Sequence, residues 1–365
     1  MIPLLKYRRL CAAVVPRAAV ILRAAVFILV LSFALTTTAY GSPTQELTFA
    51  DRNLEAAVRL HVDKPSGVLT QADVLGLRGL EASYLEITDL RGLEALTDLK
   101  DLYLRGNRIS DLGPLSKLTG LTTLVLDQSQ VSDLTALSTL TNLTLLSLEA
   151  NQITNVTPLA RLTNLTELNL GGNQISSVAP LANLTRLMVL TLGGNQITSV
   201  APLAGLTNLS WLNLNLNLTS DVSPLAALTN LTDLQLNQNR ITDVTRLSAL
   251  TNLTSLDLRE NGVTDVKSLA NLVSLTRLHL SINQISDVRP LAGLTNLTEL
   301  SLSNNQISDV TPLAKLVALM SLDLDYNQIT DVKPLNSLKA LTDLALRGNR
   351  IIDFSPVEGL QGVQR

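Results

Sequence analysis

Three residues of the types that carry nucleophilic catalysis, Asp257, His279 and Ser301, recur at one constant interval along the chain. If that interval places them on adjacent strands of a parallel sheet, they lie about 4.8 Å from one another, within reach of a Ser-His-Asp relay. A relay also needs an oxyanion hole of backbone amides and a pocket that excludes water, and a smooth parallel sheet provides neither. We therefore predict that the chain is not an enzyme, and keep a hydrolase that uses these three residues as an alternative.

A second set of residues suits binding. Trp211 is the only tryptophan of the chain, and Val189 and Asp233 stand at the same interval on either side of it. An exposed aromatic side chain among small and apolar neighbours, with charged residues at the rim, is typical of a protein-binding hot spot. Asn213 follows shortly after the tryptophan, and an aromatic platform beside amide and acid groups would also suit a glycan. A protein partner is preferred, and a glycan is the alternative.

Charged residues form a third set. It contains Asp257, Arg259, Glu260, Arg277, His279 and Glu299. Equal spacing predicts that Arg277 faces Glu299 on the adjacent strand, so part of this set would stabilise the sheet by cross-strand pairing. With two tyrosines added, the residues predicted to contact a partner are Tyr103, Val189, Trp211, Asn213, Asp233, Asp257, Arg259, Arg277, His279, Glu299 and Tyr326.

The composition excludes several other kinds of site. Cys11 is the only cysteine, so a chain that begins near residue 42 has no disulfide and no cysteine nucleophile. His61 and His279 are the only histidines, too few for a His-rich metal site, and we predict neither a metal nor a cofactor. Residues 1–41 hold five basic residues and no acid, so without them the formal charge falls from −3 to −8. A nucleic-acid partner would need a basic surface and is not expected.

Residues 1–41 have the organisation of an export signal. A basic stretch ends at Arg23, an apolar run covers residues 24–35, and small residues at Ala39 and Gly41 offer a cleavage site before Ser42. The apolar run has the length of a signal-peptide core and is short for a membrane span. We predict a signal peptide over residues 1–41 or, because the basic region is long, an uncleaved N-terminal membrane anchor. Either would place the protein outside the cell or on its surface.

Residues 42–78 are predicted to form a helical cap. Asp51 can cap a helix over residues 52–61, in which three apolar residues form one stripe. Thr70 heads a second short helix over residues 71–77, with Asp73 placed for a capping box.

The rest of the chain is a tandem repeat. From residue 97 to residue 360 a 22-residue unit occurs twelve times, with leucines at eight, five and three residues before an asparagine. A serine, Ser129, replaces that asparagine once, and a degenerate unit precedes the twelve. The asparagines are Asn107, Asn151, Asn173, Asn195, Asn217, Asn239, Asn261, Asn283, Asn305, Asn327 and Asn349.

This period is that of a leucine-rich repeat solenoid, because one coil of the repeat cannot bury its own leucines and must stack on its neighbours. The alternation of leucine with other residues predicts one short strand per unit. We therefore expect an α/β solenoid over residues 79–365: a horseshoe with a parallel concave sheet and a short helical N-terminal cap. The residues six, four and two before each asparagine should line the concave face.

The units resemble the 22-residue repeats of bacterial internalins. The resemblance rests on units such as residues 165–182, which read LTELNLGGNQISSVAPLA, and on the cap, with Asp51, Leu54, Ala57 and Val58. It implies a secreted or surface protein that binds a protein partner on the concave sheet. No immunoglobulin-like domain, sorting signal or cell-wall repeat follows the last unit, so wall anchoring and host-cell invasion are not implied.

Together these features predict an exported, non-enzymatic scaffold that recognises a protein partner. A glycan-binding surface scaffold is the alternative. The chain is expected to be a monomer, and to contact a membrane only through an uncleaved leader.

Overall fold

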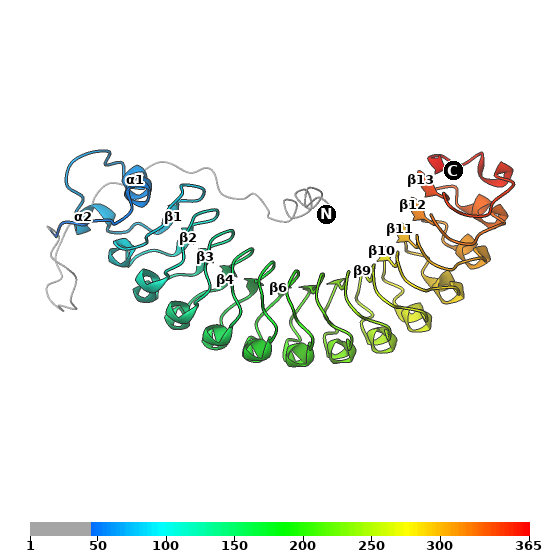
Figure 1. The fold of residues 1–365 in the computed structure, drawn as a ribbon, viewed down its shortest axis with the longest axis horizontal. Helices are drawn as coiled ribbons and strands as arrows, with labels where there is room; N and C mark the ends of the chain where they lie inside the picture. Colours follow the sequence, from blue (N-terminus) through cyan, green and yellow to red (C-terminus); the bar gives the residue numbers. More distant parts are fainter. Residues whose placement is uncertain (1–44) are drawn as a thin grey trace, which may run out of the picture. The chain divides into compact units, whose positions relative to one another are not determined.

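The computed structural model describes residues 45–365, which lie within one compact unit, Ser42–Arg365. This unit is a stack of coils, and its strands form one open sheet along the inner curve of the stack (Figure 1). The leader predicted over residues 1–41 lies outside the described residues. None of the helices within residues 45–365 is long and apolar enough to cross a membrane.

All strands of the sheet are parallel and follow one another in sequence order. The strands are β1 (Gly79–Glu81), β2 (Asp101–Tyr103), β3 (Thr123–Val125), β4 (Leu145–Ser147), β5 (Glu167–Asn169), β6 (Val189–Thr191), β7 (Trp211–Asn213), β8 (Asp233–Gln235), β9 (Ser255–Asp257), β10 (Arg277–His279), β11 (Glu299–Ser301), β12 (Ser321–Asp323), β13 (Asp343–Ala345) and β14 (Val363–Gln364). The predicted concave parallel sheet is confirmed.

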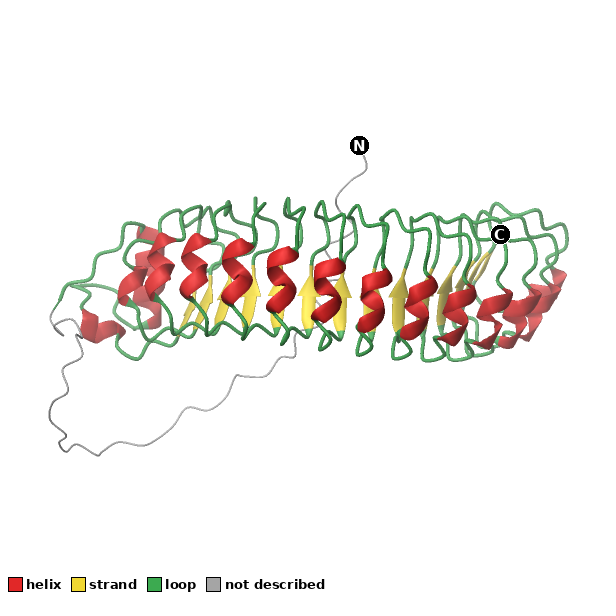
Figure 2. Ribbon diagram, turned by 90° about the horizontal axis from the view of Figure 1, so that it is seen from below, coloured by secondary structure: helices red, strands yellow, loops and turns green. Residues whose placement is uncertain are grey.

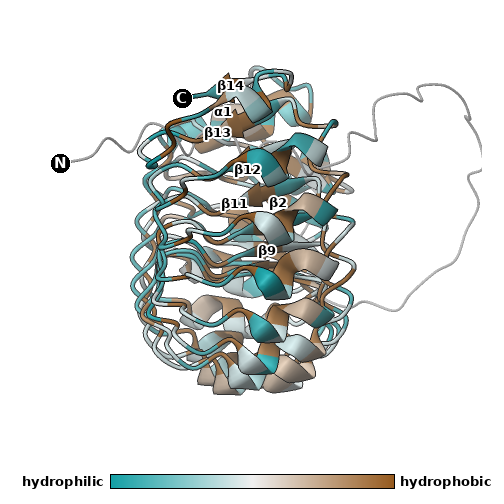
Figure 3. Ribbon diagram, turned by 90° about the vertical axis from the view of Figure 1, so that its right-hand side faces the viewer, coloured by the Kyte–Doolittle hydropathy of each residue, from teal (hydrophilic) through white to brown (hydrophobic). Residues whose placement is uncertain are grey.

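Each coil returns along the opposite side of the stack through one turn of 3-10 helix, as Figure 2 shows from that side. Seen from the end of the unit, successive coils are displaced from one another along the curve of the stack (Figure 3). The turns in residues 45–365 are η2 (Leu93–Ala95), η3 (Gly113–Lys117), η4 (Thr135–Thr139), η5 (Thr157–Arg161), η6 (Ala179–Asn183), η7 (Ala201–Gly205), η8 (Ser223–Ala227), η9 (Thr245–Ala249), η10 (Lys267–Asn271), η11 (Arg289–Gly293), η12 (Thr311–Lys315), η13 (Lys333–Ser337) and η14 (Ser355–Val357).

Leucine columns form the core of the stack. In the coil that contains β7, Leu209, Leu212 and Leu214 are all completely buried, and the equivalent leucines of the coils on either side are buried too. The central residue of each strand points into this core, and its two neighbours point to the concave side. The sheet therefore displays on its concave face the residues that the repeat leaves variable.

The asparagine column satisfies buried backbone groups between successive coils. Asn195 donates through Nδ2 to the carbonyl oxygens of Leu170 and Leu192, at 2.9 and 3.0 Å. Its Oδ1 accepts from the backbone N–H of Ile175 at 2.9 Å. Without the side-chain amide these groups would be buried and unpaired, which costs free energy.

Ser129 interrupts this column, and its hydroxyl is buried without a hydrogen-bond partner among the described residues. The shorter side chain leaves the N–H of Ile109 without the asparagine acceptor that Ile87 and Val131 have in the flanking coils.

We expect Ser129→Asn to raise the free energy of unfolding by about 1–2 kcal/mol, because it pairs groups that are now buried and unpaired. Urea denaturation measures the change, and Ser129→Ala, which only removes the hydroxyl, is the control. Equal stability of the asparagine and alanine variants would contradict this account.

The N-terminal cap follows the prediction, with one difference. α1 (Arg52–His61) begins at Asp51, whose Oδ1 accepts from the N–H groups of Asn53 and Leu54 at 2.9 and 3.2 Å. α2 (Gln71–Val74) has the expected Thr70 capping box but ends earlier than predicted. The helix ends at Val74 because the backbone of Leu75 is extended and Gly76 has a φ of +77°.

The C-terminal end carries a strand that the repeat pattern did not predict. β14 (Val363–Gln364) pairs in parallel with β13 after the last 22-residue unit. Phe354 packs against the core beside it, and the guanidinium of Arg365 lies 5.0 Å from the centre of the Phe354 ring. The last leucine column is therefore covered by residues outside the regular repeat.

Candidate functional site

The strand register places the predicted binding residues as the repeat requires. Val189 on β6, Trp211 on β7 and Asp233 on β8 are direct neighbours across the sheet, and Asn213 follows at the end of β7 on the same concave side. These four residues form one continuous surface, which we call the Trp211 surface.

Trp211 is only partly exposed, whereas the sequence led us to expect an exposed indole. Its neighbours Val189 and Asp233 are one strand spacing away and also partly buried, because side chains on adjacent parallel strands pack against one another. Met188, which precedes β6, is half exposed, and its carbonyl oxygen accepts the backbone N–H of Trp211 at 3.1 Å. Met188 was not among the residues predicted from the sequence, and its column, which is mostly threonine, holds a second methionine, Met320.

Two glycines lie in the concave column beside the Trp211 surface. Gly171 and Gly193 occupy the column two residues before the asparagine, where most coils carry a side chain. Gly171 is buried, and a Cβ there would meet Oδ1 of Asn169, the carbonyl oxygen of Gly193 and Cγ2 of Thr191, all at 3.4 Å. A Cβ at Gly193 would lie 2.9 Å from Oδ1 of Asn213, so that space is already filled by the asparagine. Neighbouring side chains and backbone therefore cover both glycines.

The charged set pairs differently from the prediction. Arg277 does lie opposite Glu299 in the register, but its guanidinium reaches across β9 to the carboxylate of Asp233, at 3.8 Å. Glu299 instead lies 3.6 Å from Nε2 of His279. The expected Arg277–Glu299 pair is therefore wrong: a long arginine side chain can span two strand spacings, and on β9 it passes the small side chain of Ser255. The contact links the charged set to the Trp211 surface.

Asp257 and Arg259 form the tightest ion pair of the concave face. Nε of Arg259 donates to both carboxylate oxygens of Asp257, at 2.9 and 3.1 Å. Asp257 is only 1% exposed, so the arginine covers its carboxylate. A buried carboxylate needs such a partner to remain ionised, and the pair therefore has a structural role.

The hydrolase alternative depends on contacts among Asp257, His279 and Ser301. The register does place the three side chains in one column on β9, β10 and β11. Their hydrogen-bonding groups are engaged elsewhere, however. The hydroxyl of Ser301 contacts the hydroxyl of Ser281 at 2.5 Å and donates to Asp323 at 3.3 Å. Burial lowers the pKa of His279, although Asp257 and Glu299 oppose the shift. The arrangement is that of a packed polar surface.

The two tyrosines occupy different places. Tyr103 ends β2 and is partly exposed on the concave face. Tyr326 follows β12, in the turn, with a φ of +55°. A Cβ at Gly348 of the next coil would collide with the Tyr326 ring, so the ring lies over that glycine. Tyr326 therefore lies at the edge of the sheet, whereas the sequence led us to expect it among the partner-binding residues of the concave face.

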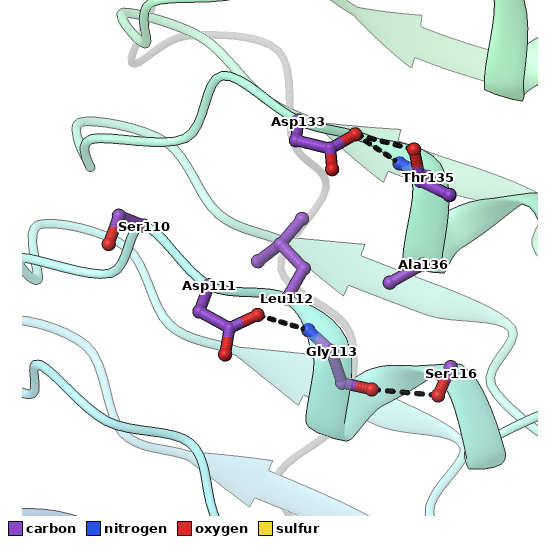
Figure 4. Close-up of a pocket in the computed structure, with 8 residues that line it drawn as sticks. All are labelled: Ser110, Asp111, Leu112, Gly113, Ser116, Asp133, Thr135 and Ala136. Atoms are coloured by element: carbon purple, nitrogen blue, oxygen red, sulfur yellow. Dashed lines mark hydrogen bonds between the residues drawn. The ribbon is translucent and has the colours of Figure 1, made fainter.

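A shallow pocket of about 340 Å³ lies away from the sheet, between η3 and η4 (Figure 4). It exists because Gly113 has no side chain and Ala136 stands where most coils have a proline. Both carboxylates of the pocket take part in local contacts: Asp111 accepts from the N–H of Gly113 at 2.8 Å, and Asp133 accepts from the hydroxyl of Thr135 at 2.6 Å. These carboxylates begin the 3-10 turns and therefore have a structural role.

The comparisons with known proteins agree with this architecture. A family model described as leucine-rich repeats (2 copies) matches residues 97–139, 141–183, 163–205, 229–271, 251–293 and 273–315, and a second, described as leucine rich repeat, matches residues 295–351. A comparison with curated protein sequences gave no match.

Three solved structures illustrate the similarity. An internalin, InlF, from Listeria monocytogenes is 39% identical with a TM-score of 0.85, over 87% of this chain and 94% of that one. A leucine-rich repeat protein of Leptospira interrogans is 26% identical with a TM-score of 0.68, over 77% of this chain and 82% of that one. The PEPR1–AtPEP1 complex is 26% identical with a TM-score of 0.68, over 79% of this chain and 44% of that one. The chain belongs to the internalin-like family of bacterial leucine-rich repeat proteins.

Proposed function

We propose that this protein is an exported, non-enzymatic scaffold that binds a protein partner on the concave face of its repeats. The observation that carries the proposal is the Trp211 surface. The one tryptophan of the chain lies on the concave sheet, next to Val189 on the adjacent strand. Aromatic side chains with an apolar surround and a charged rim contribute most of the binding energy in protein interfaces.

The similar structures support a protein partner. The PEPR1 structure is a complex with AtPEP1, and internalin-like chains share the extended concave sheet that repeat proteins use for recognition. Export is supported by the sequence of residues 1–41, with its basic stretch and apolar run. We propose a monomer that contacts a membrane only if this leader is not cleaved.

A glycan is the second candidate, favoured by the amide and acid groups around Trp211. Two contacts argue against it as the first choice. Oδ1 of Asn213 already accepts the N–H of Asn215 at 2.9 Å, and Oδ1 of Asp233 accepts from Gln235 at 2.7 Å. Polar groups that are engaged within the protein have less capacity to bind sugar hydroxyls.

Immobilised protein and its Trp211→Ala variant, exposed to the same mixture of candidate partner proteins, test this function. A partner protein that is retained by the wild type but not by Trp211→Ala supports the proposal. In a second experiment, the wild type and the Trp211→Ala variant are applied to a glycan array. Retention of a defined glycan that depends on Trp211, with no protein retained, would replace the protein partner by the glycan.

We expect His279→Ala to leave any hydrolytic rate of the purified protein unchanged, because the hydroxyl of Ser301 contacts Ser281 and Asp323. The measurement is ester and amide hydrolysis by wild type, His279→Ala and Ser301→Ala. A rate that disappears in both variants would make the protein a hydrolase and overturn the non-enzymatic assignment.

A further inference from the structure

We propose that the partner presents an extended cationic segment, in which a basic side chain pairs with Glu167 and a side chain about three residues away packs on Trp211. This inference rests on the proposed function and adds the chemistry of the partner. It names Glu167 as the residue that determines specificity for positive charge.

Glu167 differs from the other acids of the concave face. Eight of the ten carboxylates in the concave columns of β2–β13 accept a hydrogen bond or lie in an ion pair with arginine, and a ninth, Glu299, lies 3.6 Å from Nε2 of His279. Those eight are Asp101, Asp127, Glu149, Asp233, Asp257, Asp323, Asp325 and Asp343. Glu167 is exposed and has no hydrogen bond or ion pair to any residue of the described chain. Its charge is therefore available to a ligand.

The surroundings of Glu167 are acidic and apolar. From β2 to β7 the concave columns carry four acids, Asp101, Asp127, Glu149 and Glu167, against one base, Arg105. The basic residues of the opposite half of the sheet are already engaged: Arg259 with Asp257, Arg277 with Asp233, and Arg347 with Asp325. A cationic segment is thus attracted to the half of the sheet that contains Trp211 and not to the other half.

Strand spacing sets the length of the segment. Glu167, Val189 and Trp211 are consecutive in one row of the sheet, so Glu167 and Trp211 are two spacings, or about 10 Å, apart. An extended chain covers the same distance in about three residues. The partly exposed Leu145 lies on the far side of Glu167 in the same row.

The test uses a short peptide because the natural partner is unidentified. The probe is an amide-capped octapeptide with two arginines and one leucine among glycines and serines, and a matched octapeptide carries glutamates in place of the arginines. Binding to the full chain is followed by the emission of Trp211, which is the only tryptophan. The variants are Glu167→Gln and, as a control with the same loss of charge, Glu86→Gln, whose carboxylate is exposed in the turn after β1.

We expect the arginine peptide to shift Trp211 emission saturably and the glutamate peptide to have no effect. Glu167→Gln should raise the Kd of the arginine peptide about three- to fivefold, the range of a solvent-exposed ion pair, and the increase should shrink at high salt. Glu86→Gln should leave the Kd unchanged. Equal weakening by both variants would show that net charge alone attracts the peptide, and would overturn the inference.

The proposed function and this inference can fail separately. If a protein partner is lost with Trp211→Ala but keeps its affinity with Glu167→Gln, the scaffold function stands and the cationic segment is wrong. If the arginine peptide binds through Glu167 but no protein partner depends on Trp211, the cation site stands and the proposed function is wrong.

Discussion

Leu214→Ala is expected to lower the free energy of unfolding by about 2–5 kcal/mol, the range for a leucine that leaves a cavity in a packed core. Leu214 is completely buried in the coil of β7, and the equivalent residues of the adjacent coils, Leu192 and Leu236, are completely buried as well. The cavity would be enclosed by neighbouring coils that are fixed by their own hydrogen bonds, so it cannot easily collapse. Urea denaturation followed by circular dichroism measures the loss. Unfolding should stay cooperative, because each coil is stabilised by its neighbours.

Leu216→Ala is the matched control for this experiment. It removes the same atoms slightly later in the same coil, but Leu216 is 44% exposed in the turn. Its loss should stay within about half a kcal/mol, as is usual for surface positions. A loss of that small size at Leu214 would place its column outside the core and contradict the register described above.

Trp211→Ala is expected to weaken the binding of a protein partner by about 2 kcal/mol or more, which corresponds to roughly a thirtyfold increase in Kd. The reason is that Trp211 combines a large aromatic surface with apolar neighbours at the centre of the accessible row. The effect on folding should be below about 1 kcal/mol, since the side chain lies outside the leucine core. Isothermal titration of the partner and urea denaturation of the free proteins measure the two quantities.

Fluorescence gives a second readout at the same residue. Because Trp211 is partly buried, its emission in the free protein should lie between that of a buried and that of an exposed indole, and it should shift to the blue when a partner removes water. Tyr326→Ala, an exposed aromatic residue at the edge of the sheet, should leave binding unchanged. Normal binding by Trp211→Ala would move the site away from β7, toward the charged set around Asp257 and Glu299.

The fold was predictable because the repeat is strict. Leucine spacing, the asparagine column and the prolines of the return segment all describe the same coil, and nothing inside the array shifts the register. The ends were less predictable, since they have no repeat to follow. α2 stops at Val74, where the backbone turns extended before Gly76, and β14 adds residues 363–364 to the sheet without any leucine signal.

The sequence by itself determined which residues face the concave side, because side chains alternate along a strand and the 22-residue period keeps every coil in phase. It thereby identified Trp211, Val189 and Asp233 as neighbours. The tertiary structure alone decided how the charged side chains pair, because an arginine side chain has several rotatable bonds and can reach a carboxylate on the adjacent strand or one two strands away. Arg277 pairs with Asp233 and not with Glu299. Glu167 remains exposed. Spacing fixes the positions of Cβ atoms, and the packing of neighbouring side chains fixes the positions of the charges.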